Sequence, residues 1–157
     1  MQSKTRHVIS LSLRLILGVV FGYAAYTKLS QPWALFAISV DAYHILPEWA
    51  VTVVARGLPW LELALAVLIV LGAWRRATSV AASTLLLFFF GMMVRAYLRG
   101  EQIDCGCFGP GEAISPLTLV RDGALLAVSG FLTWDGFQHS RRKPARSFQS
   151  QYSSYTS

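Results

Sequence analysis

Long apolar stretches separated by short polar segments make up most of this chain. Four of them hold about 20 mostly apolar residues each, the length that a helix needs to cross a hydrocarbon layer roughly 30 Å thick. Barrel strands are about half as long and alternate polar with apolar residues, so the pattern favours helices. The predicted spans are Val8–Tyr26, Trp49–Leu71, Ala77–Leu98 and Pro116–Trp134. They predict an all-α fold, a polytopic membrane four-helix bundle.

Composition supports one compact membrane domain. Hydrophobic residues make up 54% of the chain and charged residues 14%, with a mean hydropathy of +0.47, far from an ordinary soluble domain. We expect an N-terminal segment at 1–7, a membrane domain at 8–135 and a basic, disordered tail at 136–157. The first span lacks an Ala-x-Ala site before Lys28, which favours a retained helix over a cleaved signal peptide.

Three local features refine the helices. Between the first two spans, Lys28–Glu48 contains Pro32 and an apolar run, which predicts a short helix lying at the membrane interface or over the bundle. Pro59 predicts that the second span either starts near that residue or kinks there. Gly18 and Gly22 share one face of the first span, and this G-x-x-x-G spacing favours close packing inside the bundle over dimerisation of the protein.

The distribution of Lys and Arg predicts the orientation. An even number of spans puts both termini on one side, which carries nine of the 14 basic residues: Lys4, Arg6, Arg14, Arg75, Arg76, Arg141, Arg142, Lys143 and Arg146. The positive-inside rule then places both termini in the cytoplasm, within the lipid bilayer of a cell membrane. We read the net charge of +6 as this orientation signal and not as a sign of nucleic-acid binding.

The only two cysteines lie one glycine apart, at Cys105 and Cys107, in a loop between the last two spans. By the charge count this loop is extracytoplasmic, where disulfides persist. Two cysteines so close would form a strained and labile disulfide, which favours redox exchange over a structural crosslink. An inert, loop-structural role and a metal site remain as alternatives. Zinc normally takes four ligands, and the candidate partners are His44 and scattered carboxylates.

Ionisable residues at the same end of the spans form the second candidate cluster: Glu62, Arg95, Arg121, Asp122 and Asp104. Charges at membrane depth are costly and usually face the bundle interior in pairs. We expect Glu62 to pair with Arg95 or Arg121, either as a clasp that keeps the helices in register or as a means of tuning the thiols. A nearby arginine lowers a cysteine pKa, whereas Asp104 opposes that effect.

Four pieces of the sequence together resemble a known family. They are GYAAYTKL at 22–29, PWLEL at 59–63, DCGCFG at 104–109 and TLVRD at 118–122. This layout resembles the methylamine-utilisation family MauE, within the DoxX-like group of four-helix membrane proteins, over roughly residues 8–135.

The resemblance implies a redox-associated protein of the bacterial inner membrane. MauE is linked to maturation of the disulfide-rich small subunit of methylamine dehydrogenase. By that likeness Cys105 and Cys107 carry redox activity, Glu62 and Arg121 support it, and the partner is a thioredoxin-like protein or an exported client with disulfides. The alternatives are a quinone-linked oxidoreductase subunit, as other DoxX-like proteins suggest, and a non-catalytic assembly chaperone or small transporter. The DoxX-like alternative implies a quinone as cofactor, and the sequence indicates no other.

Overall fold

Five helices account for most of the described chain. The computed structural model describes residues 2–101, 103–108 and 111–141, and the side chains of 8–138 apart from residues 102, 109 and 110. The helices are α1 (Gln2–Leu29), α2 (Trp33–Asp41), α3 (Glu48–Leu71), α4 (Arg75–Leu98) and α5 (Pro116–Arg141). The described part contains no strand, only one isolated β-bridge, between Asp104 and Ala113.

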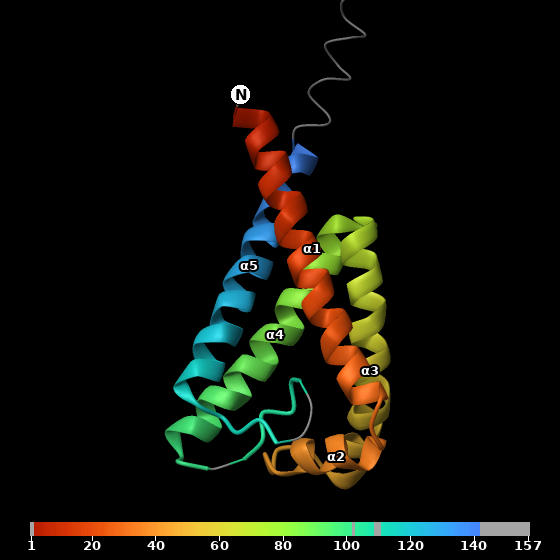
Figure 1. Ribbon diagram of the computed structural model, residues 1–157, viewed down its shortest axis with the longest axis vertical. Coiled ribbons are helices and arrows are strands. Elements are labelled where there is room, and N and C mark those ends of the chain that lie inside the picture. The colour runs from red at the N-terminus through yellow and green to blue at the C-terminus, as the bar shows by residue number, and fades with distance from the viewer. Residues whose placement is uncertain (1, 102, 109–110, 142–157) are drawn as a thin grey trace, which may run out of the picture.

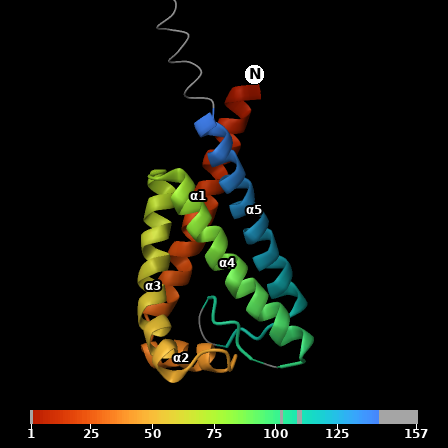
Figure 2. The ribbon, with the colours of Figure 1, turned by 180° about the vertical axis from the view of Figure 1, so that it is seen from behind.

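The four long helices form two packed pairs, α1 with α3 and α4 with α5. Figures 1 and 2 show α2 lying across one end of the bundle, next to the loop that joins α4 to α5. The start of α1 and the end of α5 lie at the opposite end. The central core between the pairs is built from Leu17, Phe21, Leu65, Ala66, Ile69, Ala82 and Leu132.

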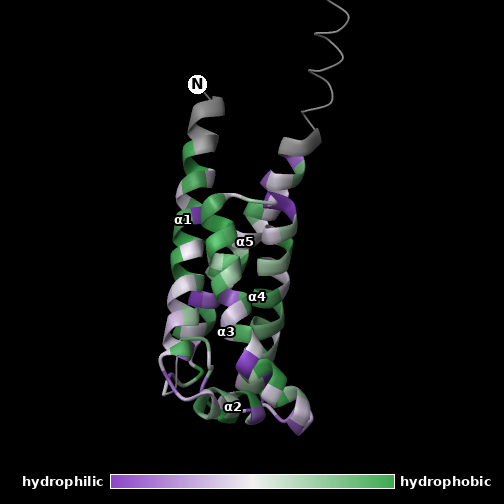
Figure 3. Cartoon of the chain, turned by 90° about the vertical axis from the view of Figure 1, so that its right-hand side faces the viewer, coloured by the Kyte–Doolittle hydropathy of each residue, from purple (hydrophilic) through white to green (hydrophobic). Residues whose placement is uncertain are grey.

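The four predicted spans are confirmed. Helical segments long and apolar enough to cross a membrane run over Val8–Leu29, Glu48–Leu71, Arg75–Leu98 and Pro116–Gln138. Apolar residues cover most of their length in Figure 3, and many large ones point outward, such as Val19 and Leu71. An outward apolar surface of this extent suits lipid and not water. The protein is therefore a multi-pass membrane protein.

Helix α2 matches the short helix predicted between the first two spans. Its buried Phe36 and Val40 pack against Val51, Ala55 and Leu58 of α3. Pro32 precedes its first residue and adopts an extended conformation, which suits a residue at a helix start. The helix therefore covers the end of α3 instead of lying free at the interface.

Two helix details settle questions that the sequence left open. Helix α3 begins at Glu48 and continues through Pro59, so this span does not start near Pro59. Gly18 of α1 lies against Val70 and Ala66 of α3, which confirms packing within the bundle.

Helix α5 continues to Arg141, beyond the expected end of the span. The expected disordered tail falls mainly on residues 142–157, which lie outside the described residues.

Candidate functional site: a dithiol above a buried ion pair

The described parts of the cysteine loop, residues 99–101, 103–108 and 111–115, come back together between α4 and α5. The Cys105 N–H donates to the Glu112 carbonyl at 2.8 Å, and the Ile114 N–H donates to the Ile103 carbonyl at 3.1 Å. Asp104 accepts a 3.0 Å bond from the Gly111 N–H. These bonds join the described parts of the loop without a regular sheet.

Gly106 allows the loop to turn between the two cysteines. Its φ is +69°, in the left-handed region that residues with a Cβ rarely adopt. A Cβ at this position would lie 3.3 Å from Cβ of Ser39 and 3.4 Å from Cε2 of Phe36, both in α2. Glycine therefore permits both the turn and the close approach of the loop to α2.

The two cysteines are free thiols held next to each other. Cys105 is 1% exposed, whereas Cys107 is half-buried. The Cys107 N–H donates to Cys105 Sγ at 3.4 Å, and the Cys107 thiol donates to the Cys105 carbonyl at 3.7 Å. The Cys105 carbonyl also accepts a 3.3 Å bond from the Tyr43 hydroxyl. Burial raises the pKa of Tyr43, so this hydroxyl keeps its proton and remains a donor.

The pKa values of the two thiols are shifted in opposite directions. Hydrogen bonds from the thiol and the backbone of Cys107 lower the pKa of Cys105, against the opposing effects of burial and of Glu112. The same thiol pairing, together with burial, raises the pKa of Cys107 well above its usual range. Cys105 is thus the thiol that ionises first, and Cys107 is the donor that stabilises it.

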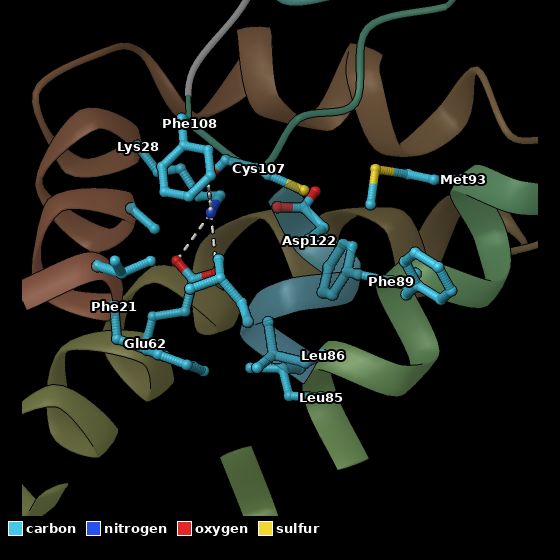
Figure 4. Close-up of a pocket in the computed structure, with 14 residues that line it drawn as sticks. Phe21, Lys28, Glu62, Leu85, Leu86, Phe89, Met93, Cys107, Phe108 and Asp122 are labelled. Atoms are coloured by element: carbon cyan, nitrogen blue, oxygen red, sulfur yellow. Dashed lines mark hydrogen bonds and ion pairs between the residues drawn. The ribbon is translucent and has the colours of Figure 1, made fainter. Parts of the chain in front are cut away.

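Glu62 pairs with Lys28 and with neither arginine, so the expected pairing with Arg95 or Arg121 was wrong. The Lys28 ammonium lies 2.8 Å from each carboxylate oxygen of Glu62, and both side chains are buried. It also donates a 2.8 Å bond to the Cys107 carbonyl (Figure 4). In the sequence Lys28 belongs to the GYAAYTKL segment and follows the first predicted span, with no indication of a partner, but α1 runs to Leu29 and carries Lys28 into the bundle.

Arg121 lies in a separate cluster at the start of α5. It forms an ion pair with Glu112 of the cysteine loop and bonds Oδ1 of Asp122 at 3.0 Å. Its guanidinium also stacks over the Phe108 ring, 4.3 Å from the centroid. The second carboxylate oxygen of Glu112 accepts a 3.4 Å bond from the Cys105 thiol. Arg121 thus reaches Cys105 through Glu112.

The polar cluster predicted from the sequence did not contain Lys28 or Glu112. It did contain Arg95, which lies apart from the other residues of the site. Arg95 is exposed and makes no hydrogen bond or ion pair with the residues that the structure describes. Asp104 bonds the loop backbone and not a thiol. The sequence does contain one indication of a role for Glu112, because it is the only carboxylate between the cysteines and α5. No cluster of metal-binding side chains occurs among the described residues.

A small cavity lies beneath Cys107. Lys28, Glu62 and Asp122 line it together with mostly apolar side chains of α1, α4 and α5, such as Phe21 and Phe89 (Figure 4). Its volume is about 50 Å³. A cavity of about 150 Å³ accommodates benzene, and a water needs about 10–15 Å³. The cavity therefore has room for a few waters.

Four lipid-facing spans, a capping helix and a packed dithiol loop define an all-α polytopic membrane protein with a thiol site at one end. The family model described as "Methylamine utilisation protein MauE" matches residues 6–135. The chain belongs to the MauE family.

Curated relatives agree with this assignment. The chain is 37% identical over 121 residues to "Methylamine utilization protein MauE" of Paracoccus denitrificans, covering 75% of this chain and 64% of the relative. Proteins of the same name match from Methylorubrum extorquens, at 31% identity over 81% of this chain, and from Methylophilus methylotrophus, at 32% over 74%. The matches cover 69% and 61% of those two relatives, so the chain spans about two thirds of their length. No solved structure was found to match the chain.

Proposed function

We propose that this protein is an integral membrane thiol–disulfide redox factor that supports maturation of exported, disulfide-containing proteins. The names of its relatives connect the proposal with methylamine utilisation, where a client of the methylamine dehydrogenase small-subunit type is the first candidate. The observation that carries the proposal is the pair of free thiols, Cys105 and Cys107, held side by side with the Cys107 N–H 3.4 Å from Cys105 Sγ.

The exchange proceeds in two steps. The Cys105 thiolate attacks a client disulfide, so that one S–S bond breaks, a mixed disulfide forms and a client thiolate leaves. The Cys107 thiolate then attacks Sγ of Cys105, which releases the client as a dithiol and leaves a Cys105–Cys107 disulfide. The reverse sequence passes that disulfide to a reduced client. Because Cys105 is 1% exposed, the loop must move away from α2 before a protein substrate can reach it.

Glu112 is the proton acceptor of this proposal. Its Oε2 lies 3.4 Å from Sγ of Cys105, close enough to receive the thiol proton. Arg121 holds the other oxygen of the same carboxylate.

Location follows from the same proposal. We place the protein in the bacterial inner membrane, with both termini in the cytoplasm and the cysteine loop on the opposite side. There the loop meets exported proteins during their oxidation, and the lipid bilayer surrounds the four spans.

A trapping experiment tests the proposed function. In Cys107→Ser the mixed disulfide has no resolving thiol, so a covalent adduct with a client or a thioredoxin-like partner should accumulate on a non-reducing gel and disappear with dithiothreitol. The matched control is Cys105→Ser, which removes the attacking thiolate and should give no adduct. If the double Ser variant supports full maturation of exported disulfide proteins in its host, the redox function is refuted and an assembly chaperone role replaces it.

A further inference from the structure

The end of the bundle opposite the cysteines contains a buried arginine, Arg14 of α1, which is 9% exposed. Among the described residues it makes no hydrogen bond and no ion pair. Arg75 of α4 and Asp135 of α5 both lie within electrostatic reach of its guanidinium. A second positive charge beside a largely buried guanidinium is unfavourable, so this arrangement favours a bound anion.

A second guanidinium converges on the same point. A Cβ built on Gly72, in the turn between α3 and α4, would lie 3.2 Å from Nη1 of Arg14 and 3.6 Å from Nε of Arg75. Gly72 has a φ of +66° and places no side chain between the two guanidinium groups. The two guanidinium groups therefore approach the same side of this turn, and together they offer several of the N–H donors with which arginines bind phosphate.

The start of α4 supplies further donors at this position. Trp74 precedes the helix and provides no side-chain cap, so no side chain from the cap residue occupies the first N–H groups of a 24-residue helix. Such N–H groups and the helix dipole favour an anion. The nearby hydroxyls of Thr78 and Ser79 donate to backbone carbonyls and do not compete for the arginines.

We propose that Arg14, Arg75 and the start of α4 bind a phosphate-class oxyanion, of the kind carried by an anionic phospholipid headgroup or by free phosphate. The recess between Arg14, Gly72 and Thr78 has a volume of about 10 Å³, space for a single oxygen-sized group. One phosphate oxygen occupies the recess beside Arg14. The rest of the group remains at the surface beside Arg75, which is exposed, at the end of the lipid-facing helices.

Thermal unfolding of the full-length protein in detergent tests this site. We expect dioleoylphosphatidylglycerol to raise the unfolding temperature and dioleoylphosphatidylcholine to leave it unchanged. Arg14→Gln should weaken the apparent affinity for the anionic lipid about ten-fold or more, since charge-assisted bonds are lost. Arg99→Gln removes the same charge from an exposed position at the other end and should keep the wild-type response.

Two further arms separate the possible results. Inorganic phosphate alone should produce no comparable shift if the source is a lipid, and an equal shift would assign the site to a free anion. Arg75→Gln leaves the buried Arg14 in place, so it reports on the site even if Arg14→Gln fails to fold. Lipid responses that are absent in the wild type, or unchanged in both arginine variants, would overturn the proposal.

Discussion

The Lys28 ammonium lies 2.8 Å from both carboxylate oxygens of Glu62, in an ion pair that joins α1 to α3. Removing one partner leaves the other charge buried and unpaired, at a cost of about 3–5 kcal/mol. Lys28→Met and Glu62→Leu should therefore each lower the free energy of unfolding by about that amount in mixed detergent micelles.

The double variant Lys28→Met with Glu62→Leu provides the control for this pair. Replacing a whole buried pair by apolar side chains is often nearly neutral, so the double variant should recover most of the loss. If the two single losses simply add in the double variant, the two charges are not coupled and the pair is not the main contact of either residue.

The reactivity of Cys105 should depend on pH in a defined direction. Its pKa lies below the usual thiol value, so the thiolate persists to lower pH than a free cysteine and disappears as the pH falls through the lowered pKa. Alkylation by iodoacetamide, followed separately for each cysteine by mass spectrometry, should show Cys105 reacting at a lower pH than Cys107, whose pKa is raised.

Glu112 and Arg121 should shift that profile in opposite directions. The Glu112 carboxylate raises the pKa of Cys105, so Glu112→Gln should move the midpoint of alkylation to lower pH. Arg121→Gln removes the cation paired with Glu112 and should move the midpoint to higher pH. Equal profiles for both variants would show that Glu112 does not act on the thiol.

Gly106→Ala should loosen the cysteine loop from α2. The substitution combines an unfavourable φ of +69° with close contacts to Ser39 and Phe36. Gly100→Ala is the matched control, because Gly100 also has a φ of +69° but a Cβ added there would have nothing within 4 Å. A larger drop in unfolding temperature and faster alkylation of Cys105 in Gly106→Ala than in Gly100→Ala would measure the contact with α2 alone.

Gly18→Ala should weaken the α1–α3 interface, whereas Gly22→Ala should not. A Cβ at Gly18 would lie 2.5 Å from Cγ2 of Val70, a β-branched side chain with little rotamer freedom in a helix. At Gly22 the nearest atom is Cβ of Ala66 at 3.8 Å, an ordinary contact. Comparing the unfolding temperatures of the two variants tests this difference, and equal values would contradict it.

The orientation predicted from Lys and Arg can be tested by labelling. After mild reduction, a membrane-impermeant maleimide should reach a cysteine introduced at exposed Ala113 in intact spheroplasts, in a background lacking Cys105 and Cys107. Labelling that appears only after lysis would place the loop in the cytoplasm, where disulfides rarely persist, and would contradict the predicted orientation.

Hydrophobic length was sufficient to predict the membrane bundle, because any chain with four such stretches must satisfy its backbone hydrogen bonds within helices. The dithiol could be found from the sequence because these are the only cysteines. The partner of Glu62 could not, since it depends on which face of each helix turns inward. Lys28 is 34 positions away, and nothing in the local pattern of either residue specifies that rotation.

Glu112 was missed for a different reason. Its carbonyl pairs with the Cys105 N–H, and this backbone bond places its carboxylate beside the thiol. Loop pairings of this kind depend on two glycines with positive φ, Gly106 and Gly111, whose dihedral angles are not encoded by hydropathy. Arg95 was included because of its sequence position near the span end, but its side chain faces outward.

The bond from Lys28 to the Cys107 carbonyl connects the α1–α3 ion pair to the dithiol loop, so we expect the stability of the bundle and the redox state of the thiols to be linked. A change of oxidation state that rotates the Cys107 peptide away from Lys28 removes a charge-assisted bond from the α1–α3 clasp. By reciprocity, any perturbation that separates α1 from α3 must also change the midpoint potential of the thiols. Gly18→Ala, far from either sulfur, is therefore expected to shift that potential, and an unchanged value would show that the helices and the thiols are independent.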